Sequence, residues 1–339
     1  MLKKAFFLLV LGFIVAVVPT AWWLNNLRNP VTPPQDYGGL LTVLPGESLS
    51  RLLSRLSNEG WQLPTTQIKL YARFYQLDHQ IRAGDYPIQN CCSSSTEWLD
   101  LLTSGQQLTH RITLIEGWDF AQISAALRAE PKIADVLSDE AYAAAHELRM
   151  GYESAEGLFF PDTYDYASGE SDRDILKRAR KRQRDLVQKL WQERPPGLPY
   201  ETPYDAIILA SIVERETASL PEAPQIAGVY VSRLRKGWRL EADPTVIYGL
   251  GNDYTRRLTL TDLRTQGPWN TYKNYGLPPT PISTPSENSL RAALAPVETG
   301  AMYFVAKGDG THLFSRTLAE HHQNIKTVRA KRRQARTRK

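Results

Sequence analysis

Residues Thr202 to Thr217 read TPYDAIILASIVERET and predict a helix that is buried on most of its sides. Thr202 has the side chain of an N-cap, Pro203 suits the first helical position, and Asp205 completes a pattern close to a capping box. The helix is therefore expected to begin at about Tyr204. At roughly 100° per residue its apolar side chains point in almost every direction, as in a core helix; they are Ile207, Ile208, Leu209, Ile212 and Val213.

Two carboxylates stand near the end of this helix, and because Glu214 and Glu216 are two positions apart they cannot share a face. Glu214 lies one turn after the small residues Ala210 and Ser211, so its face would leave room for a ligand. Glu216 lies one turn after two bulky β-branched residues, which suits a packed carboxylate paired with a basic side chain. The carboxylate expected to meet a ligand is therefore Glu214.

The end of a buried helix favours acid chemistry. A carboxyl near the negative end of the helix dipole, among apolar neighbours, has a raised pKa, which a general acid working near neutral pH requires. The opposing interpretation is that both glutamates are structural ion-pair partners of Arg215 and other arginines. Helix geometry alone leaves both interpretations open.

An uncharged segment near the start of the chain predicts a membrane anchor. Residues Ala5 to Leu24 read AFFLLVLGFIVAVVPTAWWL, long enough as a helix to cross a bilayer. Lys3 and Lys4 precede it, so residues 1–4 are expected in the cytoplasm and the rest of the chain outside the inner membrane, in the periplasm. A cleaved signal peptide is the rival interpretation, but the apolar run is long for one and lacks an A-x-A-like site.

The charge of the chain is uneven. The formal net charge is +5, yet residues 326–339, KTVRAKRRQARTRK, hold eight Lys or Arg and no acid, so the remainder is mildly acidic. Such a tail can bind polyanions, but a solvated, disordered terminus is the ordinary outcome, and no nucleic acid is expected as a partner. The only cysteines, Cys91 and Cys92, are adjacent; a disulfide between them would be strained, so no disulfide framework is predicted.

The periodicity after the anchor predicts an α+β chain in two parts. A linker over residues 25–39 leads to a small α+β module, 40–108, with the leucine spacing of an amphipathic helix after Ser48 and the character of a binding or spacer domain. The order of strand, turn and helix recurs in ITLIEGWDFAQISAALR from Ile112 to Arg128. This second copy is expected to open a larger α+β domain, 109–325, followed by the basic tail, 326–339.

Residues 238 to 285 lack regular periodicity but are rich in aromatic residues, which argues against disorder. Trp269, Tyr272 and Tyr275 stand beside amides, hydroxyls and the carboxylate of Asp243. Flat aromatic faces and polar groups together suit a sugar-binding cleft. The same aromatics could instead form a minor core, and His312 could face the cleft or lie exposed in a hairpin.

Several chemistries find no pattern in this sequence. There is no HExxH, no paired CxxC, no phosphate loop, no Rossmann glycine pattern and no GxSxG, so neither a metal nor a cofactor is expected. Glycan cleavage is the reaction class that remains. Ordinary glycosidases use two carboxylates. Asp243 is the only nearby partner for Glu214, and it could equally be a turn cap.

Several long motifs resemble the YceG-like family of endolytic murein transglycosylases. They occur in order as EGLFFPDTY, IILASIVERET, RLRKGWRLEADPTVIYGLG, NTYKNYGLPPTPISTPSENSLRAALAP and YFVAKGDGTHLFS, and the 40–108 module resembles that family's LysM-like domain. The resemblance covers nearly the whole chain. It does not extend to the basic tail or to the paired cysteines.

The resemblance implies a lytic mechanism in which a single glutamate, placed on Glu214, acts first as acid and then as base. The bond cut would be the β-1,4 link from N-acetylmuramic acid to N-acetylglucosamine inside nascent peptidoglycan strands, leaving 1,6-anhydro ends and terminating elongation. Because no water is consumed, one carboxylate can suffice. Asp243, Thr245, Asn270 and Tyr272 would line the sugar cleft.

Two alternatives stay open. One is a hydrolytic muramidase with Glu214 as acid and Asp243 as second carboxylate, which would leave reducing ends. The other is a membrane-tethered peptidoglycan-binding scaffold without turnover. Glycan strands, and peptidoglycan synthases of the elongation machinery, are the expected partners.

Overall fold

The computed structural model describes residues 25, 27–88, 92–138, 140–148, 151–216, 219–251, 254 and 256–337. The chain divides into two compact units. Unit 1 comprises Met1–Arg111, Pro131–Ala134 and Asp165–Ser171, and unit 2 comprises Ile112–Glu130, Asp135–Tyr164 and Asp172–Lys339. Both contain helices and antiparallel strand pairs, so the predicted α+β class is confirmed.

The predicted membrane helix, residues 5–24, lies outside the described residues. Within the part of the chain that the structure describes, no helix combines the length and the apolar character needed to cross a bilayer.

Unit 1 is built on a short antiparallel pair covered by three helices. Strand β1 (Leu40–Val43) pairs with β2 (Gly84–Pro87), and the helices are α2 (Leu49–Asn58), α3 (Thr65–Phe74) and α4 (Ser95–Thr103). Ser48 caps α2 as predicted by accepting a hydrogen bond from the Arg51 N–H. The expected apolar face of α2 is confirmed, since Leu49, Leu52, Leu53 and Leu56 are all buried. Cys92 is disulfide-bonded.

Two further strand pairs occur along the chain. Strand β3 (Thr109–Thr113) pairs with β4 (Thr163–Ala167), and α5 (Phe120–Ala129) and α6 (Ala141–Glu147) lie between them in sequence. The predicted late hairpin is confirmed as β5 (Tyr303–Ala306) and β6 (His312–Ser315), paired antiparallel. Its turn uses Gly308 and Gly310, both with positive φ.

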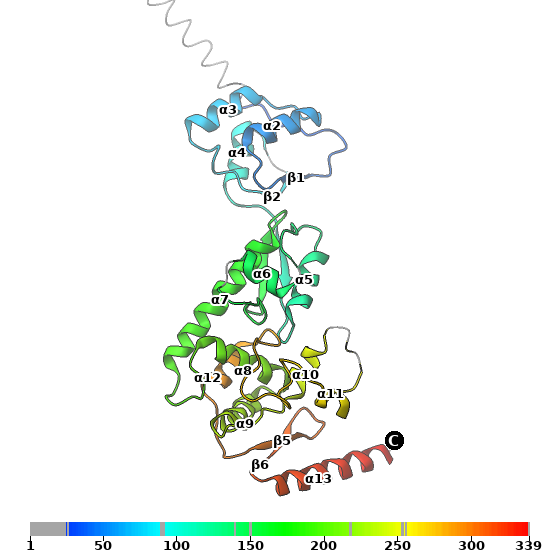
Figure 1. The fold of residues 1–339 in the computed structure, drawn as a ribbon. Coiled ribbons are helices and arrows are strands. Elements are labelled where there is room, and N and C mark those ends of the chain that lie inside the picture. The colour runs from blue at the N-terminus through cyan, green and yellow to red at the C-terminus, as the bar shows by residue number, and fades with distance from the viewer. Residues whose placement is uncertain are drawn as a thin grey trace, which may run out of the picture. The chain divides into compact units, whose positions relative to one another are not determined.

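Helix α8 (Pro203–Glu216) lies at the centre of unit 2 (Figure 1). Every residue from Ala206 to Val213 is buried, as the all-round apolar pattern predicted. The capping box is present: the Thr202 hydroxyl accepts from the Asp205 N–H at 3.2 Å, and the Asp205 carboxylate accepts from the Thr202 N–H at 3.0 Å. The helices packed against α8 are α7 (Asp172–Glu193), α9 (Ala223–Arg235), α10 (Asp243–Gly249) and α12 (Glu287–Leu294).

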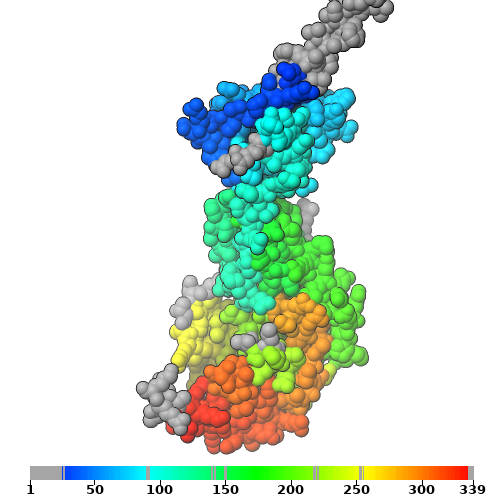
Figure 2. Space-filling model, turned by 180° about the vertical axis from the view of Figure 1, so that it is seen from behind, coloured from blue at the N-terminus to red at the C-terminus, as the bar shows by residue number. Residues whose placement is uncertain are grey.

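The basic tail differs from the expectation of disorder. Helix α13 spans Leu318–Thr337 and packs on β5 and β6. A capping box at Thr317 and Glu320 starts it, and the following Ala, Gln, Lys and Arg residues are strong helix formers. Figure 2, from behind, shows the C-terminal segments in orange and red gathered at the lower end of unit 2.

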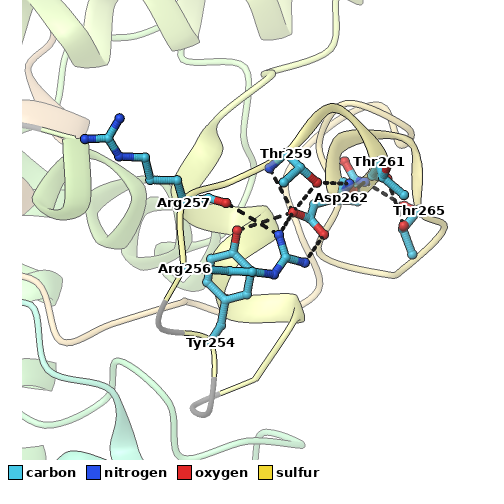
Figure 3. Close-up of polar contacts among 8 residues, drawn as sticks. Tyr254, Arg256, Arg257, Thr259, Thr261, Asp262 and Thr265 are labelled. Carbon is cyan, nitrogen blue, oxygen red and sulfur yellow. Dashed lines mark hydrogen bonds and ion pairs between the residues drawn. The ribbon is translucent and has the colours of Figure 1, made fainter.

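A polar cluster lies at the start of helix α11 (Leu260–Arg264). Asp262 accepts two hydrogen bonds of 2.7 Å from the Arg256 guanidinium, and others from the Thr259 N–H and hydroxyl (Figure 3). These donors hold the pKa of Asp262 well below its usual range. In this part of the segment that looked irregular in sequence, side-chain hydrogen bonds rather than periodic packing hold the described residues together.

Candidate active site

A cavity of about 560 Å³ opens in unit 2 beside the C-terminal end of α8. Glu216 enters it from α8, Asp243 from the first turn of α10, and Tyr272 from the loop that follows α11. The remaining wall comes from α9, the β5–β6 hairpin and α13, through side chains that include Tyr230, Arg233, Tyr303, His312 and His321. The cavity thus joins parts of the chain that are more than a hundred residues apart in sequence.

Glu216 has the environment of a carboxyl that exchanges a proton near neutral pH. Burial raises its pKa to about 7, and the negative charge of Asp243 acts in the same direction. Its place as the last residue of α8, at the negative end of the helix dipole, disfavours the charged form too. The Tyr230 hydroxyl opposes these effects by donating a hydrogen bond of 2.7 Å to Oε1 of Glu216.

Asp243 and Tyr272 form a second polar pair in the cavity. The Tyr272 hydroxyl donates to Oδ1 of Asp243 at 2.6 Å. Asp243 is exposed and Tyr272 is partly exposed, so both can meet a ligand. The predicted proximity of these two cleft residues agrees with this geometry.

The backbone just before Asp243 is held in an uncommon conformation. Glu241 has φ of 51°, which a residue other than glycine seldom adopts. The buried Arg233 fixes this turn: its guanidinium donates to the Leu240 carbonyl at 2.6 Å and to the Met302 carbonyl at 2.9 Å. Such a turn over-determined by neighbours is typical of a functional site.

Thr245 and Asn270 lie beneath the cavity surface. Thr245 is fully buried, and its hydroxyl bonds to the Ala242 carbonyl and the Thr271 hydroxyl. The Asn270 amide donates to the Thr265 carbonyl at 2.7 Å and accepts from the Tyr272 N–H at 2.9 Å. Their polar atoms are used within the protein, so they position the loop that carries Tyr272 and the start of α10.

Glu214 does not line this cavity. Its Oε2 accepts hydrogen bonds from the N–H and the hydroxyl of Ser286, the N-cap of α12, at 2.8 and 2.6 Å. Gly117 lies on its other side, where an added Cβ would be 3.8 Å from the Glu214 Cγ. Partial burial raises the pKa of Glu116, and the nearby negative charge of Glu214 acts in the same direction.

The small residues below Glu214 make room for a chain segment rather than for a ligand. The Ser211 hydroxyl accepts from the Ile282 N–H at 3.0 Å, and the Ser283 hydroxyl donates to the Ser211 carbonyl at 3.1 Å. The bulkier face of α8 is the one that ends in the cavity. The expected salt bridge of Glu216 is absent from the described residues, where Tyr230 is its partner, and Arg215 donates to the Gly117 carbonyl instead.

Sequence reasoning also passed over a buried carboxyl in EGLFFPDTY. Glu156 is 2% exposed and accepts from the Phe120 N–H, at the start of α5, with both oxygens at 3.1 Å. The Tyr248 hydroxyl on α10 donates to it at 3.1 Å. Burial raises the pKa of Glu156 to about 8. The signal available in the sequence was an acidic residue next to a glycine in a loop rich in aromatic residues. The sequence does not show that this acidic side chain is buried.

The sequence left undecided whether His312 faces the cleft or lies exposed in a hairpin. In the structure it lines the cavity. It is buried, and its Nδ1 lies 2.8 Å from an oxygen of Glu222. In the described part of the chain, no group of three or more His, Cys, Asp or Glu side chains has the arrangement of a metal site.

Comparison with known proteins identifies relatives along most of the chain. The model of the YceG-like family matches residues 41–327. An endolytic murein transglycosylase of Bacillus subtilis strain 168 is 27% identical over 319 residues, which are 88% of this chain and 87% of that protein. A protein of the same name from Streptococcus pneumoniae strain R6 is 25% identical over 228 residues, 65% of this chain and 39% of its own length.

A solved structure has the same fold. The crystal structure of a YceG-like protein from Listeria monocytogenes aligns with 84% of this chain and 98% of its own, with a TM-score of 0.53 and 26% sequence identity.

Proposed function

The chain belongs to the YceG-like family, and from this premise we propose that it is an endolytic lytic transglycosylase of peptidoglycan. Its relatives in Bacillus subtilis and Streptococcus pneumoniae carry the name endolytic murein transglycosylase. The bond to be cut is the β-1,4 link from N-acetylmuramic acid to N-acetylglucosamine inside a glycan strand. The product end is a 1,6-anhydro-muramyl residue.

The observation that carries the mechanism is the carboxyl of Glu216, with a pKa of about 7, in one cavity with Asp243 and Tyr272. A group half protonated near neutral pH can give up a proton and take one back at little cost. We therefore assign the acid and base role to Glu216. The sequence-based assignment to Glu214 stays the rival hypothesis.

The reaction needs one proton donor that becomes a proton acceptor. Protonated Glu216 gives its proton to the glycosidic oxygen, and the bond from that oxygen to the muramyl C1 breaks. The C6 hydroxyl of the same sugar then bonds to C1, and the Glu216 carboxylate takes the hydroxyl proton. No water enters, and Glu216 ends the cycle protonated.

Asp243 has the complementary role in this proposal. Its carboxylate, oriented by the Tyr272 hydroxyl, stabilises the positive charge that develops at C1. Thr245 and Asn270 keep Asp243 and Tyr272 in place without touching the sugar.

The experiment is mass spectrometry of glycan fragments released from purified peptidoglycan strands by the full chain and by its Glu216→Gln and Glu214→Gln variants. Anhydro-muramyl ends from the wild type and Glu214→Gln, but not from Glu216→Gln, support the proposal. Loss in Glu214→Gln alone returns the role to Glu214. Reducing ends favour a two-carboxylate hydrolase, and intact strands from all three proteins favour a binding scaffold.

The cellular setting is part of the proposal. The uncharged segment 5–24 would anchor the chain in the inner membrane with the enzyme in the periplasm, and residues 40–108 would act as a LysM-like glycan-binding module. Cleavage next to peptidoglycan synthases would then end strand elongation. Expression with reporters fused at either end tests the orientation.

A further inference from the structure

A second cavity, of about 530 Å³, lies in unit 2 between α7, the start of α8 and the segment from Gly151 to Leu158. It shares no lining residue with the Glu216 cavity. Its base is apolar, formed by the buried Leu158, Val187 and Ile207. None of the residues lining this second cavity has a role in the mechanism proposed above.

One polar side chain in its wall has an unused acceptor. Gln183 is 1% exposed, and its Nε2 donates to the Gly157 carbonyl at 3.1 Å. Because a carbonyl can only accept, this bond fixes which end of the amide faces Gly157. The other end, Oε1, has no hydrogen-bond donor among the described residues. A buried acceptor left without a donor is costly, so a ligand N–H at this point would be favoured.

Two guanidinium groups stand at the same cavity. Arg180 and Arg184 lie one helical turn apart on α7, and both line the cavity. Burial and the charge of Arg184 lower the pKa of Arg180, so the two positive charges act on each other. None of the described residues lining this cavity is acidic. Arg184 also contacts the carboxylate of its chain neighbour Asp185 at 3.3 Å, outside the cavity lining, and Arg180 donates to the Leu148 carbonyl at 3.2 Å. A ligand carboxylate that reaches both guanidinium groups would accept charge-assisted hydrogen bonds from them.

We propose that this cavity binds a short peptide bearing carboxylates, namely the peptide stem attached to the glycan strand. The two arginines would hold a carboxylate, Gln183 Oε1 would accept a peptide N–H, and the apolar base would take small side chains. The choice of a stem peptide rests on the proposed function. In chemical terms, the cavity requires an anionic group and an amide donor on one flexible ligand.

The test is calorimetric titration of the full chain with a synthetic stem pentapeptide that carries no sugar, beside the same peptide with its carboxylates converted to amides. We expect saturable binding of the acidic peptide, and binding of the amidated peptide that is at least tenfold weaker. Arg184→Gln should weaken binding of the acidic peptide about tenfold. Lys189→Gln removes an equal charge from an exposed position of α7 outside the cavity and should leave binding unchanged.

Gln183→Leu tests the proposed acceptor, because leucine fills similar space without an oxygen. Its binding of the acidic peptide should be weaker than that of the wild type, and thermal unfolding checks that the variant is folded. Three outcomes would overturn the inference and leave a cavity that holds water only. They are equal binding of both peptides, equal effects of Arg184→Gln and Lys189→Gln, and no binding by the wild type. Strand cleavage measured alongside separates the two proposals. Peptide binding without strand cleavage would contradict the proposed function alone. Strand cleavage without peptide binding would contradict only the proposed binding of the peptide stem.

Discussion

The hydroxyl of Tyr230 donates a 2.7 Å hydrogen bond to Glu216, so the carboxyl with the raised pKa in the cavity has a neutral partner rather than a cationic one. A guanidinium in that place would keep the carboxylate charged and unable to donate a proton. The Tyr230 hydroxyl lowers the pKa of Glu216 only in part, so this carboxyl can still carry a proton near neutral pH.

Replacing Glu216 with Gln should reduce the rate of anhydro-end formation by about 10²- to 10⁴-fold, the usual contribution of a general acid and base. Glu214→Gln should keep the rate within about tenfold, because Glu214 bonds to the Ser286 cap outside the cavity. Initial rates on purified strands measure both. Equal loss in the two variants would contradict the assignment.

The pH profile of kcat/KM should fall as pH rises through about 7, because Glu216 must be protonated to start the reaction. Tyr230→Phe removes the hydrogen bond that stabilises the carboxylate, so the Glu216 pKa should rise and the falling limb should move to higher pH. Tyr275→Phe removes a hydroxyl from an exposed ring outside the cavity and serves as the control. An unmoved limb in Tyr230→Phe would show that another group controls it.

Glu156→Gln should stabilise the protein above pH 8 and have little effect near pH 4. The pKa of Glu156 is raised from an ordinary value of 4.5 to about 8 in the folded protein. Between these values the folded state binds a proton that the unfolded state has lost, so stability falls as pH rises and the loss is complete above pH 8. The effect is on the order of several kcal/mol. Urea unfolding at pH 5 and pH 9 measures it, with the exposed Glu193→Gln as control.

Gly228→Ala should destabilise unit 2 strongly. A Cβ at Gly228 on α9 would lie 2.2 Å from the Val297 carbonyl oxygen, which is backbone and cannot swing away. The resulting overpacking typically costs about 1–3 kcal/mol or more. Gly267→Ala is the matched control, because an added Cβ there meets nothing within 4 Å. Thermal unfolding of both variants tests this, and equal melting temperatures would refute the close approach.

The features that could be predicted from sequence are those set by neighbours along the chain. The Thr202 cap, the buried pattern of α8 and the leucine face of α2 are local, and the structure confirms them. The hairpin turn also followed from the order of its residues. Asp243 and Tyr272 lie within hydrogen-bond distance of each other, as expected of neighbours in one cleft, but their binding of a sugar stays a prediction.

The choice between the two glutamates of α8 could not be predicted because it depends on which distant segment covers each face of the helix. Residues 282–286 cover the side of Ala210 and Ser211, seventy residues earlier in the chain, and bring Ser286 to Glu214. Small side chains in a helix signal close approach, but not whether chain or ligand approaches. The burial of Glu156 under Phe120 and Tyr248 depends on similar long-range packing.

The first turns of α13 close one side of the Glu216 cavity through Leu318, His321, His322 and Ile325. A chain that stops before Leu318 would keep Glu216, Asp243 and Tyr272 but would lose the part of the cavity wall that α13 supplies. The cavity is therefore complete only when α13 is folded against the β5–β6 hairpin. Under the proposed function, a chain truncated before α13 would present Glu216 in a cavity that is open on one side.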